Sequence, residues 1–232
     1  MDFAETEDQK MIREMVREFA ETVAGPTCEK RDKEQIAPIE EFKKFAELGF
    51  AGMTIPEQYG GQKLDDVSEA IVIEELSRVD PSLGVMVAVH VGLCSMTIAL
   101  SGNETQKEKY LPKLASGEFL GAYSLSEAGS GTDAAAMVAK ATDNGDCYTL
   151  NGEKMWVTNG TTADLFVLFA KVTDHPDYGK KSHGGVTCFI IEKGFEGFEI
   201  GKKEDKLGIR SSDTCTLILN NCKVPKENVL GE

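Results

Sequence analysis

The sequence lacks most of what a disulfide-bonded or metal-binding protein needs. Its six cysteines lie at positions 28, 94, 147, 188, 215 and 222, and no two of them have C-x-x-C spacing. Its 3 histidines are too few and too scattered to form a metal cluster. We therefore expect reduced cysteines, no metal site and a cytoplasmic location.

Positive charge is also scarce. The chain has 25 Lys and Arg against 39 Asp and Glu, a net charge of -14 at pH 7. A field of that sign repels phosphate backbones and anionic lipid, so we expect neither nucleic acid nor a membrane as a partner. The amino-terminal sequence MDFAETEDQK is acidic and lacks the apolar stretch of a signal peptide.

Long uncharged runs are rare as well. Residues 83–100 form 18 residues without a formal charge, which reaches the length of a transmembrane segment. Polar and small residues such as Gly84, His90 and Gly92 dilute this run, and no basic cluster flanks it. The run therefore favours a buried helix of a helical domain.

Helical patterns fill the first half of the chain. Thr6 and Gln9 have the spacing of a capping box, and an apolar stripe follows them until Gly25-Pro26, where we expect the helix to end. Further helices are expected at residues 38–48, 66–79, 83–100 and 103–112. These patterns predict an all-α amino-terminal domain over residues 1–115.

The second half has the pattern of a β domain over residues 116–232. Asn151-Gly152 predicts a hairpin turn between two short strands. Short strands are expected at residues 119–125, 137–141, 148–150, 154–157, 165–172, 186–191 and 214–219. Together, the two halves predict an α+β multidomain fold, in which a helical domain precedes a β-sandwich or barrel.

Two segments of the β half carry groups suited to a flat, polar ligand. Residues 123–133 read YSLSEAGSGTD, where glycines allow a close backbone approach and hydroxyls can bond polar edges. Residues 155–160 read MWVTNG and contain the only tryptophan. On a strand, Trp156 and Thr158 would point to the same face. Taken singly, each segment is more typical of an ordinary loop or of core packing.

Taken together and in this order, the two segments resemble the flavin-binding segments of the acyl-CoA dehydrogenase family. The resemblance continues through KEDKLGIR at residues 203–210 and VPKENVLGE at residues 224–232, and it covers the helical half. It is greatest to the short-chain, butyryl-CoA branch of the family. The fold expected from the patterns is the one that this resemblance implies.

The resemblance implies an FAD site on this chain. Ser126 would bond the pyrimidine edge of the flavin, Trp156 would pack beside the ring, and Thr158 would bond near its N5. Thr132 would also contact the acyl-CoA substrate. The cofactor-binding set implied by the resemblance is Tyr123, Ser124, Leu125, Ser126, Gly131, Thr132, Trp156, Val157 and Thr158.

Several other polar residues invite a functional interpretation. We favour a structural role for Glu127, a satisfied core position for His90, and a solvated or capping role for Glu74 and Glu75. Arg210 is equally compatible with an anion contact, a partner subunit or a structural ion pair. By resemblance, Val85, Val89 and Leu93 are candidates for the acyl-chain pocket.

The family oxidises acyl-CoA thioesters to 2,3-enoyl-CoA and passes electrons to an electron-transfer flavoprotein. Its members form homotetramers, and their catalytic glutamate lies in a carboxy-terminal helical domain. The resemblance thus implies no catalytic residue in this chain, which we expect to be an incomplete enzyme, inactive alone. Two alternatives stay open, namely a flavin-dependent oxidase or hydroxylase on the same fold and a non-catalytic binding or assembly module.

Overall fold

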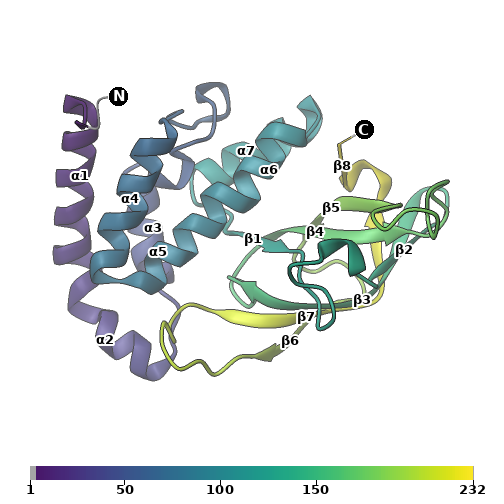
Figure 1. The fold of residues 1–232 in the computed structure, drawn as a ribbon. Coiled ribbons are helices and arrows are strands. Elements are labelled where there is room, and N and C mark those ends of the chain that lie inside the picture. Colours follow the sequence, from purple (N-terminus) through teal and green to yellow (C-terminus); the bar gives the residue numbers. More distant parts are fainter. Residues whose placement is uncertain (1–3, 232) are drawn as a thin grey trace.

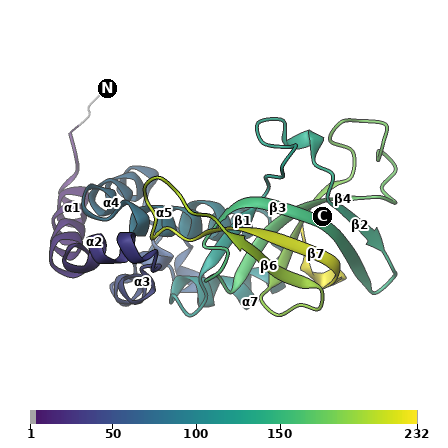
Figure 2. The same cartoon turned by 90° about the horizontal axis from the view of Figure 1, so that it is seen from below.

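The computed structural model describes residues 4–231, in which a helical half and a strand half lie side by side (Figures 1 and 2). The expected fold class, helical domain before β domain, is confirmed. The helices are α1 (Glu7–Phe19), α2 (Gly25–Glu34), α3 (Ile39–Glu47), α4 (Asp66–Val79), α5 (Pro81–Ala88), α6 (Met96–Ser101) and α7 (Glu104–Ala115). The strands are β1 (Gly121–Ser124), β2 (Lys140–Asp143), β3 (Cys147–Thr158), β4 (Leu165–Val172), β5 (Val186–Glu192), β6 (Phe198–Lys203), β7 (Thr214–Pro225) and β8 (Val229–Leu230).

The first helix begins as predicted and continues past its predicted end. Thr6 and Gln9 form a capping box at the start of α1. The stop expected at Gly25-Pro26 is wrong, because a π-helical stretch, Ala20–Ala24, joins α1 directly to α2. Pro26 falls in the first turn of α2, just after the wide π turn, where a missing N–H and a bulky ring are tolerated.

The uncharged run forms an interior helix. Asp80 caps it by accepting hydrogen bonds from the backbone N–H groups of Ser82 and Leu83. A π-helical stretch, Val89–Ser95, joins α5 to α6, so the helix is continuous from Pro81 to Ser101. This segment is long and apolar enough to cross a membrane by length and composition, and half of its apolar stretch is buried inside the molecule. Core helices share these features.

The last helix of the half is α7. Asn103 caps it, as the sequence predicts, and forms a capping box with Gln106 that was not predicted. The end expected near Pro112 is wrong, because α7 runs to Ala115 with Pro112 inside it. Strand β1 begins at Gly121, and the predicted domain boundary between residues 115 and 116 stays a prediction.

The strands form one mostly antiparallel sheet. Its order is β6-β7-β3-β2-β4-β5-β8, and β1 and β2 both pair with β4 in parallel. Aromatic rings from strands that are not neighbours in this order meet inside the sheet. The ring centroids of Phe166 on β4 and Phe198 on β6 are 4.8 Å apart, and those of Tyr148 on β3 and Phe189 on β5 are 5.4 Å apart. The sheet therefore curls around its own core, as a barrel does.

One predicted hairpin is absent among the described residues. The sequence Asn151-Gly152 lies within β3, so its assignment to a turn is wrong. The pairing of β3 with β7 shifts between Leu150 and Gly152, which marks a β-bulge. Gly152 has φ 148°, and a Cβ there would lie 2.8 Å from Ala139, so the close approach of the two segments requires glycine. Strands β6 and β8 were not predicted.

Strand β4 is buried on both faces, which explains its continuous apolar sequence LFVLFA. Its inner face contributes to the core of the curled sheet. Its outer face packs with β5 against the carboxy-terminal helices of the first half, in a cluster that includes Ile98, Tyr110, Leu111, Leu114, Leu165, Val167 and Ile190. The two halves thus share a hydrophobic interface.

His90 lies in this interface region, within the π-helical stretch. It is fully buried, its Nδ1 accepts a hydrogen bond from the Gly121 N–H at 3.0 Å, and its Nε2 lies 3.1 Å from the Leu114 carbonyl oxygen. Both ring nitrogens are therefore used by the neutral form, and the predicted satisfied core position is confirmed. Burial lowers the pKa of His90 from 6.5 to about 4.

This pKa predicts an acid-sensitive fold. Between pH 6.5 and pH 4 the unfolded chain protonates His90 and the folded chain does not. The free energy of unfolding therefore decreases as the pH is lowered through that window, by roughly 3 kcal/mol in total. Substituting His90→Gln should remove this contribution to the slope. The measurement is urea unfolding of both proteins across the window; equal slopes would contradict the assignment.

Candidate functional site

A small cavity lies where β1 and β3 meet the interior helix. Its volume is about 190 Å³, and its lining comes from the π-helical stretch, from β1 and the segment after it, and from the end of β3. The lining residues are Val89, Leu93, Tyr123, Leu125, Ser126, Met155, Trp156 and Thr158. The two sequence segments singled out for chemistry therefore meet in one place.

The structure separates the predicted cofactor-binding residues into two groups. Tyr123, Leu125, Ser126, Trp156 and Thr158 line the cavity. Strand alternation places the side chains of Ser124 and Val157 in the interior, and neither belongs to the lining. Gly131 and Thr132 are exposed in the loop that follows and also lie outside the lining. The binding roles of all nine residues stay predictions.

Trp156 owes its position to a bulge. The pairing of β3 with β7 shifts between Lys154 and Val157, and Trp156 has φ 59°. Trp156 lines the same cavity as Thr158, as the strand pattern predicts, while the residue stays 59% exposed. An exposed indole face beside hydroxyl groups suits a flat aromatic ligand with polar edges.

Two of the three predicted pocket residues of the interior helix belong to the lining. Val89 and Leu93 lie four residues apart on the π-helical stretch and contribute to it, whereas Val85 does not. Met155 also lines the cavity and was not predicted as a site residue. Its position next to Trp156 in the sequence is the signal that could have identified it. Single π-helical turns often mark functional sites.

The cavity lacks an acid or base suited to neutral pH. None of its eight lining residues, all within the described part of the chain, carries a carboxylate or an imidazole. Tyr123 is titratable, but burial raises its pKa. The arrangement can therefore hold and orient a ligand, and proton transfer at neutral pH would need another group.

Glu127 lies behind the cavity, where its carboxylate accepts three hydrogen bonds. Its carboxylate accepts hydrogen bonds from the Val138 N–H at 2.6 Å, the Ala139 N–H at 3.1 Å and the Lys154 ammonium at 2.6 Å. Lys154 also donates to the Leu125 carbonyl oxygen at 3.0 Å. Burial lowers the pKa of Lys154, and the bond to Glu127 opposes that shift. The structural role favoured for Glu127 agrees with these contacts.

Asn159 fixes the end of β3, directly after Thr158. It has φ 65° and is fully buried. Its side-chain N–H groups donate to the carbonyl oxygens of Met86 at 3.1 Å and Gly121 at 3.0 Å. Its backbone N–H donates to the Asp213 carbonyl oxygen at 2.9 Å. Asn159 thereby ties three elements around the cavity to one another.

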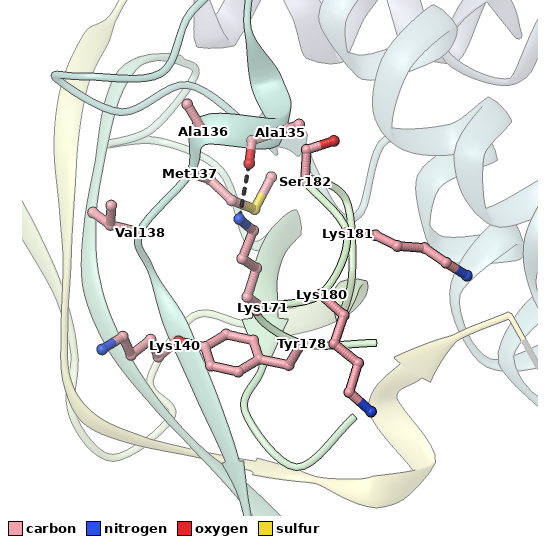
Figure 3. Close-up of a pocket in the computed structure, with 11 residues that line it drawn as sticks. Ala135, Ala136, Met137, Val138, Lys140, Lys171, Tyr178, Lys180, Lys181 and Ser182 are labelled. Atoms are coloured by element: carbon pink, nitrogen blue, oxygen red, sulfur yellow. Dashed lines mark hydrogen bonds between the residues drawn. The ribbon is translucent and has the colours of Figure 1, made fainter. Parts of the chain in front are cut away.

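A second, larger cavity lies between the loop before β2 and the loop between β4 and β5 (Figure 3). Its volume is about 600 Å³, and its lining includes Lys140, Lys171, Tyr178, Lys180 and Lys181. Lys171 lies at the centre, bonded to the Ala135 carbonyl oxygen at 2.8 Å. Lys181 pairs with Asp177, whereas Lys140 and Lys180 form no ion pair within the described residues. An anionic group suits this cavity.

The remaining polar candidates have structural partners. Arg210 pairs with Asp205 at 2.9 Å, which favours the ion-pair interpretation. The solvated or capping role expected for Glu75 is wrong, because Glu75 is buried among Arg13, Arg17 and Arg78. These arginines lower its pKa to about 2. Within residues 4–231, no three His, Cys, Asp or Glu side chains are grouped to hold a metal, and all six cysteines are free.

Two protein-family descriptions match almost the whole chain. Residues 6–118 match "Acyl-CoA dehydrogenase, N-terminal domain", and residues 122–222 match "Acyl-CoA dehydrogenase, middle domain". The first match ends in the connection between α7 and β1, and the second begins within β1.

Individual relatives agree with these matches. "Acyl-CoA dehydrogenase, short-chain specific" of Clostridium acetobutylicum is 45% identical over 100% of this chain and 60% of its own length. "Isovaleryl-CoA dehydrogenase, mitochondrial" of Pongo abelii is 42% identical over 97% of this chain and 53% of its own. A chain in the structure "Electron transferring flavoprotein of Acidaminococcus fermentans" is 46% identical, with a TM-score of 0.94, over 100% of this chain and 60% of that one. The chain therefore spans 53% to 60% of the length of these relatives.

Asn159 provides a test of the site geometry. Substituting Asn159→Asp replaces two donated hydrogen bonds with a buried negative oxygen facing two carbonyl groups, and should destabilise the fold by roughly 3 kcal/mol. The matched control is Asn151→Asp, an exposed position on β3, which should cost less than about 0.5 kcal/mol. Urea unfolding of both variants measures the difference, and equal losses would contradict the role assigned to Asn159.

Proposed function

The chain belongs to the acyl-CoA dehydrogenase family, and on that premise we propose that the whole protein is an FAD-dependent oxidoreductase that dehydrogenates acyl-CoA thioesters between their α and β carbons. The observation that carries the proposal is the cavity shared by β1, β3 and the interior helix. It joins an exposed indole, apolar side chains and three hydroxyls, those of Tyr123, Ser126 and Thr158, which is the environment that a flavin ring needs.

The residues present fit FAD. The side-chain hydroxyls of Ser126 and Thr158 make no hydrogen bond with any other residue between positions 4 and 231, so both are available to polar edges of a ligand. In the loop after Ser126, a Cβ added to Gly129 or Gly131 would meet nothing within 4 Å, so the backbone there is open to close approach. FAD, when bound, supplies the acceptor for the hydride.

The protein's own part in the reaction is to orient the flavin ring and to shield the reacting groups from water. Trp156 would cover the ring, Ser126 and Thr158 would fix its rotation, and Val89 and Leu93 would keep water from the acyl chain. Because no carboxylate lines the cavity within the described residues, we propose that the base that removes the α-proton lies outside residues 4–231.

The lysine-lined cavity supports a CoA thioester as the substrate. CoA carries phosphate groups, and Lys140 and Lys180 offer two ammonium groups without a carboxylate partner among the described residues. The chain as a whole has a net charge of -14 and would repel an anionic substrate, so binding of CoA would depend on a local basic site such as this one. The same loop that begins at the small cavity ends at this one.

The finer assignments rest on the relatives. A short acyl chain is supported by the short-chain relative, although the isovaleryl relative has similar identity. An electron-transfer flavoprotein as acceptor is supported by the structure of that name. We also propose a homotetramer and a cytoplasmic location; the free state of all six cysteines supports the latter.

The two hydroxyls give the first test of function. Substituting Ser126→Ala together with Thr158→Ala in the whole protein should weaken FAD binding at least tenfold, since each lost hydrogen bond costs about 1 kcal/mol. The measurement is visible absorbance retained after removal of free flavin. Thr149→Ala, a threonine on β3 outside the lining, serves as control. Unchanged retention in the double variant would contradict the assigned flavin site.

The lysines give an independent test of substrate class. Substituting Lys180→Ala should raise the KM for butyryl-CoA about threefold and leave kcat nearly unchanged, because a contact with an exposed charge such as that of Lys180 is worth about 0.7 kcal/mol. Raised ionic strength should lessen the difference between the two proteins. Steady-state kinetics checks this, and an effect on kcat alone would argue against phosphate binding there.

A further inference from the structure

A buried charged pair lies behind the lining of the small cavity, and the orienting and shielding of a ligand do not explain it. Lys154 and Glu127 lie 2.6 Å apart, with side chains 0% and 4% exposed. Burying two charges is expensive, and an apolar pair of similar volume often stabilises a fold as well or better. A lysine held in this position therefore calls for an explanation beyond packing.

The contacts of the pair join β3 to both ends of the loop between β1 and β2. Lys154 lies on β3, two residues before Trp156, and its ammonium also donates to the Leu125 carbonyl oxygen. Glu127 accepts from the N–H groups of Val138 and Ala139, where the loop returns to the sheet. Next to the pair, the Met155 N–H donates to the Ser126 carbonyl oxygen at 2.9 Å. The pair thus fixes the loop against the strand on which Trp156 and Thr158 lie.

The bond from Lys154 also has an electrostatic effect on one peptide group. The carbonyl of Leu125 and the N–H of Ser126 belong to the same peptide, and both residues line the cavity. A positive charge bonded to the carbonyl oxygen draws electron density toward it and makes the N–H of that peptide a stronger donor. In a water-excluded setting this polarisation is weakly screened.

We propose that Lys154, held in place by Glu127, is a positioning residue for the flavin that fixes and polarises the Leu125–Ser126 peptide at the edge of the ring. This inference rests on the proposed function. A stronger donor at that edge favours the reduced ring, which has the greater electron density. Lys154 therefore raises both the affinity for FAD and the reduction potential of the bound cofactor.

A neutral pair separates this role from simple structural support. Lys154→Met alone leaves the Glu127 carboxylate buried without its cation, so it should lower Tm whatever the role of the lysine. The double variant Lys154→Met, Glu127→Gln removes both charges and keeps both volumes. Its Tm should return close to that of the parent protein. Lys109→Met, which breaks the 2.8 Å pair between Lys109 on α7 and Glu192 on β5, is the control for loss of an ion pair elsewhere.

The experiment measures Tm, the FAD dissociation constant and the reduction potential of bound flavin in the whole protein. In the double variant we expect the dissociation constant to rise about tenfold and the potential to become more negative, while Lys109→Met changes neither. If the double variant binds FAD with the parent's affinity and potential, the pair is structural support only and the inference is wrong.

Two further outcomes keep the inference separate from the proposed function. If the parent protein binds no FAD, the proposed function itself fails, whatever the variants do. If the double variant does not fold, Lys154→Arg decides: it keeps a positive charge against both Glu127 and the Leu125 carbonyl oxygen, so the potential should stay near that of the parent. A shift in Lys154→Arg as large as that in Lys154→Met would contradict a role for the positive charge.

Discussion

The buried bond between Lys154 and Glu127 is the interaction on which the small cavity depends. The segment from Leu125 to Val138 has little regular secondary structure, so its shape must come from side chains. Glu127 ties its far end through two backbone N–H groups, and Lys154 ties its near end through the Leu125 carbonyl. Without this pair, the segment after β1 that contains Ser126 would lose the side-chain bonds that hold it against β3, where Trp156 lies, and the backbone bond from Met155 to Ser126 would remain.

The cavity also depends on how the two halves of the molecule join. The interior helix contributes Val89 and Leu93 from a π-helical stretch, and in the same stretch His90 accepts a hydrogen bond from the first residue of β1. Asn159 joins the interior helix to β1 from the other side. The site is therefore a property of the interface between helices and sheet, and neither half could form it alone.

Much of this arrangement could be predicted from the sequence, because it rests on local signals. Capping boxes at Thr6 and Asn103 and the apolar run of β4 indicate their elements directly. The π-helical stretches, the Asn151-Gly152 bulge and the depth of Lys154 could not be predicted, since each depends on residues far away in the chain. For the cavity, motif order identified Ser126, Trp156 and Thr158, whereas Lys154 carries no motif that marks it as buried.

The central claim is that FAD binds between β1, β3 and the interior helix. A crystal structure of the whole protein, purified with its flavin, tests it most directly. The account predicts the isoalloxazine ring against Trp156, with the side chains of Ser126 and Thr158 within hydrogen-bonding distance of its polar edge. A ring bound elsewhere, for instance in the lysine-lined cavity beside Lys140 and Lys180, would contradict it.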